Sequence, residues 1–196
     1  MDPVTQLIIY CLIVGIFHVS EFVLAVKYNP DKVDASCEYH GSFGDLFCIF
    51  FDPVDIILFN VLKNLIPTCA CAAWLVTTPY VLAMTLGLLE FVVHNSLVPM
   101  LSSPIDPWVG VIMCCIGEGI RKCGMMTCKR GFTHRIQTVK SHDHELTTHG
   151  IYGLVRHPGY LGWLLWCVGT QIVLQNVICG IGFFIVVRVY CKFYIV

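Results

Sequence analysis

The stretch that decides the fold spans residues 160–190 and reads YLGWLLWCVGTQIVLQNVICGIGFFIVVRVY. It is apolar throughout, apart from the strongly polar side chains of Gln171, Gln175, Asn176 and Arg188. The polar break divides it into two pieces of about 15 residues, each about 22 Å long at the rise of an α-helix. We therefore predict a helical hairpin here rather than one long helix.

The composition of the whole chain agrees with a membrane environment. Of its 196 residues, 57% are hydrophobic and 13% are charged, against roughly 45–50% and about 25% in soluble domains. This composition excludes a disordered chain and exceeds what one small soluble core requires. The net charge of -1 excludes nucleic acid as a partner, because there is no basic excess to neutralise phosphates.

Further membrane helices are expected before the hairpin. Residues 4–26 and 74–93 are long apolar stretches, and the first has no basic leader region, so we interpret it as a retained anchor. Another span runs through residues 109–120, with Asp106 suited to the N-cap and Pro107 to the first helical position. Together with the hairpin, these stretches predict an all-α integral membrane protein with about five transmembrane helices.

The chain divides into two parts by charge. Residues 1–120 hold the N-terminal membrane helices, interrupted by an atypical insert at 31–65 that carries six acidic residues. Residues 121–196 hold a polar loop followed by the hairpin. Seven of the twelve lysines and arginines lie between Arg121 and Arg156. By the positive-inside tendency, this loop is expected in the cytosol.

Titratable side chains gather in the polar loop and at the ends of the apolar spans. Five of the eight histidines lie between His134 and His157, but their spacing does not match a zinc site. We therefore predict no metal, and the loop either binds a polar ligand or is an ordinary membrane-surface segment. Three glutamates, Glu21, Glu90 and Glu118, are either functional groups at membrane depth or side chains that reach the interface.

The strongest local signal precedes the hairpin. Residues 144–163 read HELTTHGIYGLVRHPGYLGW, and residues 131–137 read GFTHRIQ. Gly150 permits a backbone conformation that other residues avoid, and Pro158 keeps His157 out of a helix. The core R-H-P-x-Y-x-G pattern occurs in several membrane enzymes, but its combination with G-F-T-H and H-x-L-x-T-x-G-x-Y is far more specific.

With these motifs, the chain resembles the isoprenylcysteine carboxyl methyltransferases of the endoplasmic reticulum. The resemblance is close across residues 131–187 and looser over 4–26 and 80–119. It implies methyl transfer from S-adenosylmethionine to the free carboxylate of a C-terminal prenylated cysteine, farnesylated or geranylgeranylated. It also implies a multi-pass protein of the endoplasmic reticulum membrane, in contact with lipid, whose partners are prenylated protein C-termini.

By position in the motifs, the resemblance implies ten cofactor contacts: Gln137, His144, Glu145, Leu146, Thr147, Tyr152, His157, Pro158, Gly159 and Tyr160. A carboxylate is already ionised at neutral pH, so methyl transfer to it needs no general base. It needs an in-line approach and exclusion of water, which is catalysis by positioning. No catalytic side chain is therefore predicted.

The family pattern continues past the hairpin with an arginine that holds the substrate carboxylate and a glutamate that contacts the cofactor. The chain reads VYCKFYIV over residues 189–196, and neither Arg188 nor Lys192 lies in register with that arginine. From this departure we expect a weak or inactive methyltransferase that retains much of the cofactor platform.

Two other functions remain open from the sequence. The chain could be a non-catalytic membrane protein that pairs with or regulates the full-length enzyme, which the missing arginine and glutamate favour. Small residues such as Gly162 and Gly169 could support such helix pairing. A homo-oligomer also stays open. The chain could also be a relative of the NADPH-dependent sterol reductases, which share the R-H-P-x-Y core. Co-purification with a complete homologue would indicate the first, and binding of NADPH the second.

Overall fold

The computed structural model describes residues 1–28, 78–132 and 147–194. The predicted insert at 31–65, the first residues of the span at 74–93, and four of the ten predicted cofactor contacts lie outside these ranges. Those four are Gln137, His144, Glu145 and Leu146.

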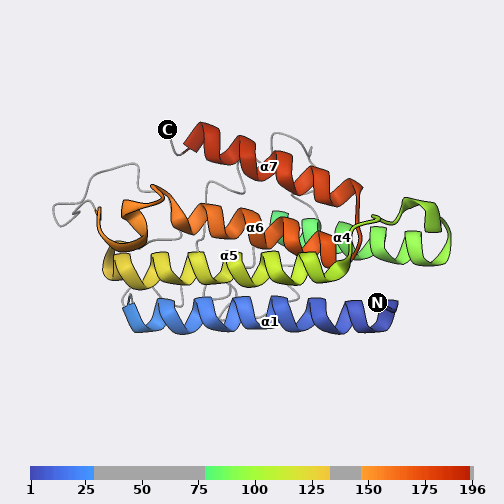
Figure 1. The fold of residues 1–196 in the computed structure, drawn as a ribbon, viewed down its shortest axis with the longest axis horizontal. Helices are drawn as coiled ribbons and strands as arrows, with labels where there is room; N and C mark the ends of the chain where they lie inside the picture. Colours follow the sequence, from blue (N-terminus) through green and yellow to red (C-terminus); the bar gives the residue numbers. More distant parts are fainter. Residues whose placement is uncertain (29–77, 133–146, 195–196) are drawn as a thin grey trace.

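The described residues are helical and contain no strand. The long helices are α1 (Pro3–Tyr28), α4 (Thr78–Ser96), α5 (Pro107–Cys128), α6 (Pro158–Val173) and α7 (Ile178–Tyr194). Short 3₁₀ turns lie at η2 (Pro99–Leu101), η3 (Lys129–Gly131) and η4 (Gly150–Gly153). Figure 1 shows α5 between α1 and α6, with α7 on the far side of α6. The prediction of an all-α protein is confirmed for these residues.

The C-terminal hairpin forms as predicted. Helix α6 ends at Val173 and α7 begins at Ile178, so the polar break lies in the turn. Gln175 adopts a positive φ of 56°, and its carbonyl accepts a hydrogen bond of 2.8 Å from the Ser103 amide. The Glu90 carboxylate of α4 accepts bonds from the amides of Ile178 and Cys179, at 2.8 and 2.7 Å. Glu90 thus supplies partners for the free N–H groups at the start of α7.

Helix α5 continues beyond the predicted span. Asp106 caps it as expected, because its carboxylate accepts a 2.9 Å bond from the Trp108 amide. The helix then passes through Arg121 and Lys122 and ends at Cys128. Both basic side chains are paired with carboxylates inside the bundle, so they do not end the helix.

Helices α5 and α6 approach closely along two rows of glycines spaced seven residues apart: Gly110, Gly117 and Gly124 on α5, and Gly162 and Gly169 on α6. A methyl group on Gly117 would lie 2.5 Å from the Gly162 carbonyl oxygen. A methyl group on Gly110 would lie 2.6 Å from the Gly169 carbonyl oxygen. Gly162 and Gly169 are therefore used for packing within the chain, and they give no support to pairing with another protein.

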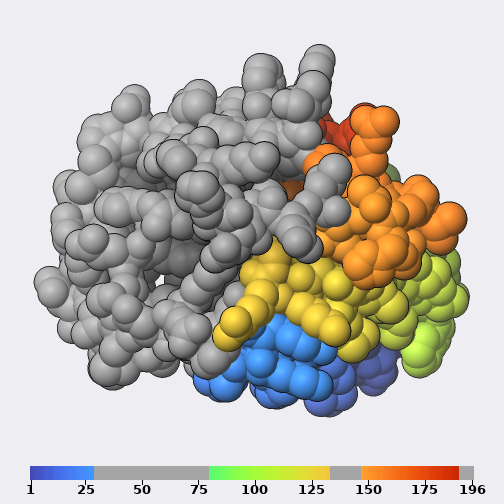
Figure 2. All heavy atoms as spheres, turned by 90° about the vertical axis from the view of Figure 1, so that its left-hand side faces the viewer, coloured from blue at the N-terminus to red at the C-terminus, as the bar shows by residue number. Residues whose placement is uncertain are grey.

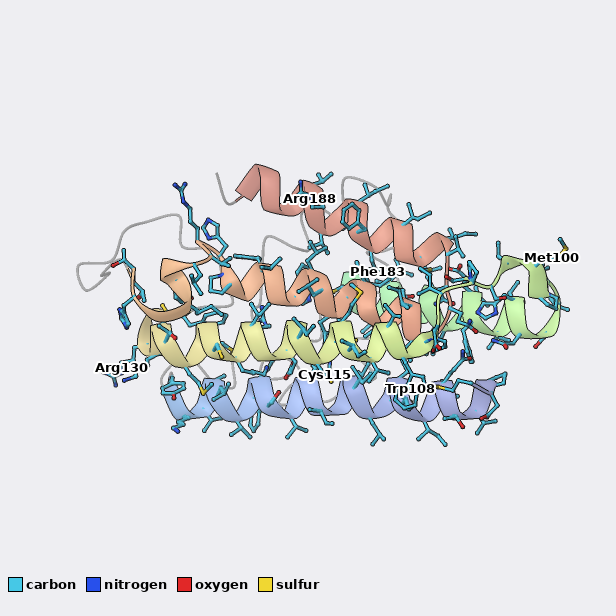
Figure 3. The ribbon with its side chains drawn as sticks, viewed as in Figure 1. Met100, Trp108, Cys115, Arg130, Phe183 and Arg188 are labelled. Atoms are coloured by element: carbon cyan, nitrogen blue, oxygen red, sulfur yellow. The ribbon has the colours of Figure 1, made fainter. Side chains whose placement is uncertain are left out.

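The core lies between α1, α4, α5 and α6. Phe17 of α1 stacks on Trp166 of α6 with 4.2 Å between the ring centroids. Tyr10, Met84 and Phe91 extend the same cluster. The outward faces stay apolar, and Trp108 on α5 is 56% exposed (Figure 3). Among the described helices, α1 is long and apolar enough to cross a bilayer, while 80–96 and 178–189 are shorter apolar segments.

The two ends of the bundle differ in chemistry. Met100 lies at one end and Arg130 at the other (Figure 3). The second end also carries the exposed side chains of Lys129 and Arg156. Figure 2 looks onto this end and shows the segment before α6 against the last turns of α5. The predicted cofactor residues within the described part of the chain lie at this basic end.

Candidate functional site

The backbone before α6 folds into a compact turn against the end of α5. Gly150 has a positive φ of 61°, as the sequence predicts, and a methyl group there would lie 3.1 Å from Cγ2 of Thr127. The amides of Leu154 and Val155 both donate to the Ile151 carbonyl, at 3.1 and 2.9 Å. A larger residue at position 150 would be strained and would push the turn away from α5.

Pro158 begins α6 and keeps His157 outside the helix. His157 has φ −130° and ψ 65°, and its carbonyl accepts bonds from the amides of Tyr160 and Leu161 at 3.2 and 3.1 Å. The rings of His157 and Tyr160 lie 6.4 Å apart in an edge-on arrangement. The predicted role of Pro158 at this boundary is confirmed, and two of the predicted cofactor side chains stand side by side.

Two other predicted residues meet at the last residue of α5. The Thr147 hydroxyl lies 3.5 Å from Sγ of Cys128. The Tyr152 side chain lies near the same thiol. Burial, followed by the nearby Cys128, raises the pKa of Tyr152, so its hydroxyl stays protonated and can donate a hydrogen bond at neutral pH.

Pro158 and Gly159 are buried between aromatic and charged neighbours. A methyl group on Gly159 would lie 2.9 Å from Cε2 of Phe132, the phenylalanine of the G-F-T-H motif. The Gly159 carbonyl accepts a 2.9 Å bond from Nη1 of Arg121. The guanidinium also lies 5.6 Å from the centres of the Phe17 and Phe132 rings. The hydrogen bond from Arg121 thus fixes the first turn of α6 to helix α5.

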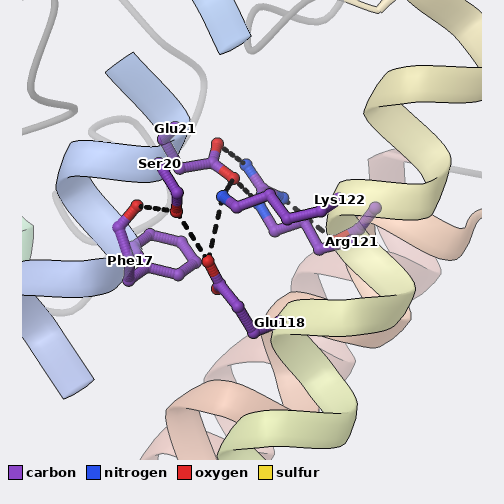
Figure 4. A network of polar contacts seen from close by, with 7 residues as sticks. Phe17, Ser20, Glu21, Glu118, Arg121 and Lys122 are labelled. Atoms are coloured by element: carbon purple, nitrogen blue, oxygen red, sulfur yellow. Dashed lines mark hydrogen bonds and ion pairs between the residues drawn. The ribbon is translucent and has the colours of Figure 1, made fainter. Parts of the chain in front are cut away.

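A buried ionic network continues from Arg121 to α1 (Figure 4). Arg121 Nε and Nη2 donate to the two oxygens of Glu21, at 2.9 and 2.8 Å. Lys122 pairs with Glu21 as well, and lies 3.3 Å from Glu118. The Ser20 hydroxyl donates to Glu118 at 2.7 Å. Two carboxylates and two cations therefore balance in charge between α1 and α5.

Two of the three glutamates singled out from the sequence are buried inside the bundle, Glu21 with 1% and Glu90 with 8% of its surface exposed. The side chain of the third, Glu118, is 19% exposed. Their depth in a membrane stays a prediction. Each binds specific partners, Glu21 at the basic end and Glu90 at the start of α7. In the sequence Arg121 stands out only as a basic residue of the polar loop, and its contact with Gly159 is visible only in the structure. The signal that could have found it was the set of carboxylates in otherwise apolar spans.

The described residues contain no group of three or more histidine, cysteine or acidic side chains placed to hold a metal ion. His134, His142 and His144 lie outside those residues. The described side chains offer instead neutral hydroxyl, imidazole and aromatic groups, which suit a nucleoside and an amino-acid moiety.

The His157 imidazole is expected to be mostly neutral at pH 7. Desolvation, and then the positive charge of Arg156, hold the pKa of His157 below its usual value. The unfolded chain regains a pKa of about 6.5 and binds the proton more tightly. Any part of the free energy of unfolding that depends on neutral His157 is therefore present above the unfolded-state pKa. It is lost as the pH falls through the lower pKa of the folded state.

An NMR titration of the His157 ring tests this. We expect a pKa below about 6.5, and an Arg156→Gln variant with a pKa raised only part of the way, because desolvation is the larger cause. A wild-type pKa at or above the reference value would contradict the assignment.

Comparison with known proteins gives a consistent result. Residues 110–195 match the model of the isoprenylcysteine carboxyl methyltransferase (ICMT) family. Protein-S-isoprenylcysteine O-methyltransferase A of Arabidopsis thaliana is 45% identical over 116 residues, which cover 58% of this chain and 58% of that protein. The B protein of the same plant is 35% identical over 145 residues, 72% of each chain.

A solved structure has the same fold. The eukaryotic intramembrane Ras methyltransferase ICMT aligns with a TM-score of 0.58 and 24% identity, over 96% of this chain and 75% of that one. The chain spans about 58% of the length of the first curated relative that it matches. The alignment to the Arabidopsis B protein covers more than two thirds of both chains. The chain therefore belongs to the isoprenylcysteine carboxyl methyltransferase family.

Proposed function

We propose that this chain binds S-adenosylmethionine at the basic end of α5 and α6, and that its site serves methylation of the carboxylate of a prenylated cysteine. The observation that carries the proposal is the buried Pro158–Gly159 corner, which sets the rings of His157 and Tyr160 side by side. Family membership supplies the reaction class.

The described residues fit such a cofactor by their chemistry. Thr147 and Tyr152 present hydroxyl groups, and His157 presents an imidazole that is mostly neutral at pH 7. Tyr160 adds a partly buried aromatic ring. The set is completed in the proposal by Gln137, His144, Glu145 and Leu146 of the same sequence motif.

When bound, the cofactor supplies an electrophilic methyl group on a sulfonium. The protein residues have to bind it, orient it and exclude water, because the substrate carboxylate is ionised without help. The Phe132 ring packs on Gly159 and the Pro158 ring on Gly124, so the corner has apolar neighbours. No described side chain has to move a proton, so we propose no general base.

The surroundings support a membrane site that opens to the cytosol. Helix α1 has the length and composition of a transmembrane helix. The exposed cations Lys129, Arg130 and Arg156 lie at the same end as the corner, as the positive-inside tendency predicts for a cytosolic face. A prenyl chain would then enter laterally from lipid, in the endoplasmic reticulum membrane by the family resemblance.

The alternative functions have less support. Gly162 and Gly169 pack against α5, so they no longer support helix pairing with a partner. The departure from the family's arginine and glutamate, which also favoured a non-catalytic partner, is left as its basis. The sterol reductase interpretation rested on the shared R-H-P-x-Y core, whereas the relatives matched over longer stretches are named as methyltransferases.

The test uses the full 196-residue chain in lipid nanodiscs. Binding of radiolabelled S-adenosylmethionine and methyl transfer to N-acetyl-S-farnesylcysteine are measured together. His157→Ala should weaken cofactor binding about tenfold, the effect of one hydrogen bond of about 1.4 kcal/mol. His149→Ala, an exposed histidine of the same segment that we leave outside the site, should change it less than twofold. Absence of cofactor binding to the wild-type chain would refute the proposal.

A further inference from the structure

One carboxylate of α1 controls the orientation of the guanidinium that holds the start of α6. Glu21 binds Arg121 through both oxygens, at 2.9 and 2.8 Å. These bonds use Nε and one terminal nitrogen of the guanidinium and direct the other, Nη1, at the Gly159 carbonyl. Because the guanidinium is planar and rigid, fixing two of its nitrogens fixes the third.

Helix α1 contributes none of the proposed cofactor contacts. Its Glu21 is connected to one of them, Gly159, through the side chain of Arg121. Gly159 lies in the chain between His157 and Tyr160, with Pro158 before it, and the two rings lie edge-on 6.4 Å apart. A shift of the Gly159 carbonyl would move both neighbours, since they share its backbone. The side chain of Arg121 is packed against Phe17 and Phe132, so it has little freedom to re-form the contact in another geometry.

We propose that Glu21 is a positioning residue for the cofactor site, acting through Arg121 on the carbonyl of Gly159. The link to the cofactor rests on the proposed function, but the mechanical link from Glu21 to Gly159 does not. Removing the charge of Glu21 weakens both bonds that set the plane of the Arg121 guanidinium, and leaves Glu118 as the charged partner of Lys122 within the described network. The guanidinium is then no longer held in the direction of Gly159.

The first variant is Glu21→Gln, with Glu90→Gln as its matched control. Both glutamates are buried on apolar helices and bonded to groups of another helix, but Glu90 acts at the start of α7. Hydrogen–deuterium exchange of the amides of residues 160–163 is measured, together with binding of S-adenosylmethionine. We expect faster exchange at these amides in Glu21→Gln alone, and about tenfold weaker binding, the low end of the cost of losing a supporting partner.

A second variant separates positioning from general stability. Arg121→Lys keeps a positive charge beside Glu21, but one ammonium group cannot bond both Glu21 oxygens and the Gly159 carbonyl in fixed directions. We expect it to retain more thermal stability than Glu21→Gln, while exchange at residues 160–163 rises and cofactor binding weakens to a similar extent. A purely structural role predicts instead that binding follows the melting temperature across all three variants.

The outcomes distinguish the inference from the proposed function. Unchanged exchange at residues 160–163 in Glu21→Gln overturns the inference, whether or not the cofactor binds. An equal rise in Glu90→Gln also overturns it, because the effect would then be general loosening. If the wild-type chain binds no cofactor but exchange rises only in Glu21→Gln and Arg121→Lys, the proposed function fails and the link from Glu21 to Gly159 stands.

Discussion

Replacing Gly162 by alanine should destabilise the bundle by about 3 kcal/mol, at the upper end of the usual cost of overpacking. The new methyl group would lie against the Gly117 carbonyl, 2.7 Å from the Arg121 amide and 2.8 Å from the Arg121 Cβ. These are backbone and near-backbone atoms, so no side-chain rotation relieves the overlap. Helices α5 and α6 must move apart, which loosens their packing along the glycine rows.

The control is Gly119→Ala on the partner helix α5, two residues from Gly117. A methyl group there meets nothing within 4 Å, so alanine should be neutral or stabilise by up to about 1 kcal/mol through its helix propensity. Unfolding in a mixed-micelle denaturant series gives the free energy of each variant. If both glycines tolerate alanine equally, the close packing of α5 on α6 is wrong.

Replacing Arg121 by methionine should cost about 3–5 kcal/mol of stability, because it breaks a buried ion pair and leaves its carboxylate undercompensated. Arg121 is 8% exposed and Glu21 1%. The change removes two bonds to Glu21 and one to Gly159. Lys122 stays as a partner of Glu21, but a single ammonium group cannot replace the guanidinium fork.

A double variant shows whether the charge or the packing matters. Arg121→Met combined with Glu21→Leu removes both buried charges and leaves Lys122 with Glu118, 3.3 Å away. Replacing both members of a buried pair by apolar groups is often close to neutral. We therefore expect the double variant to be more stable than Arg121→Met alone, measured in the same denaturant series. If the two losses simply add, the two residues are not coupled.

Local signals in the sequence predicted the parts of the site that depend on neighbouring residues. The break at Gln175 and Asn176 predicted the turn of the hairpin, and Pro158 predicted the boundary at which His157 leaves the helix. Gly150 was expected in an unusual backbone conformation, and it has a positive φ. Each of these depends on backbone sterics or local polarity, which a short stretch of sequence contains in full.

By itself, the sequence determined an apolar helical chain, its hairpin and a motif shared with one enzyme family. Only the tertiary structure decided which charged side chains are buried and which glycines lie at the contact between α5 and α6. Glu21 and Arg121 are 100 positions apart, so nothing near either residue indicates the pairing that lets α5 continue to Cys128. The same holds for Gly117 and Gly162, whose small size has meaning only against the opposing backbone. Contacts between helices are a property of the assembled bundle. The role of each contacting residue depends on a partner that is distant in the sequence and close only after folding.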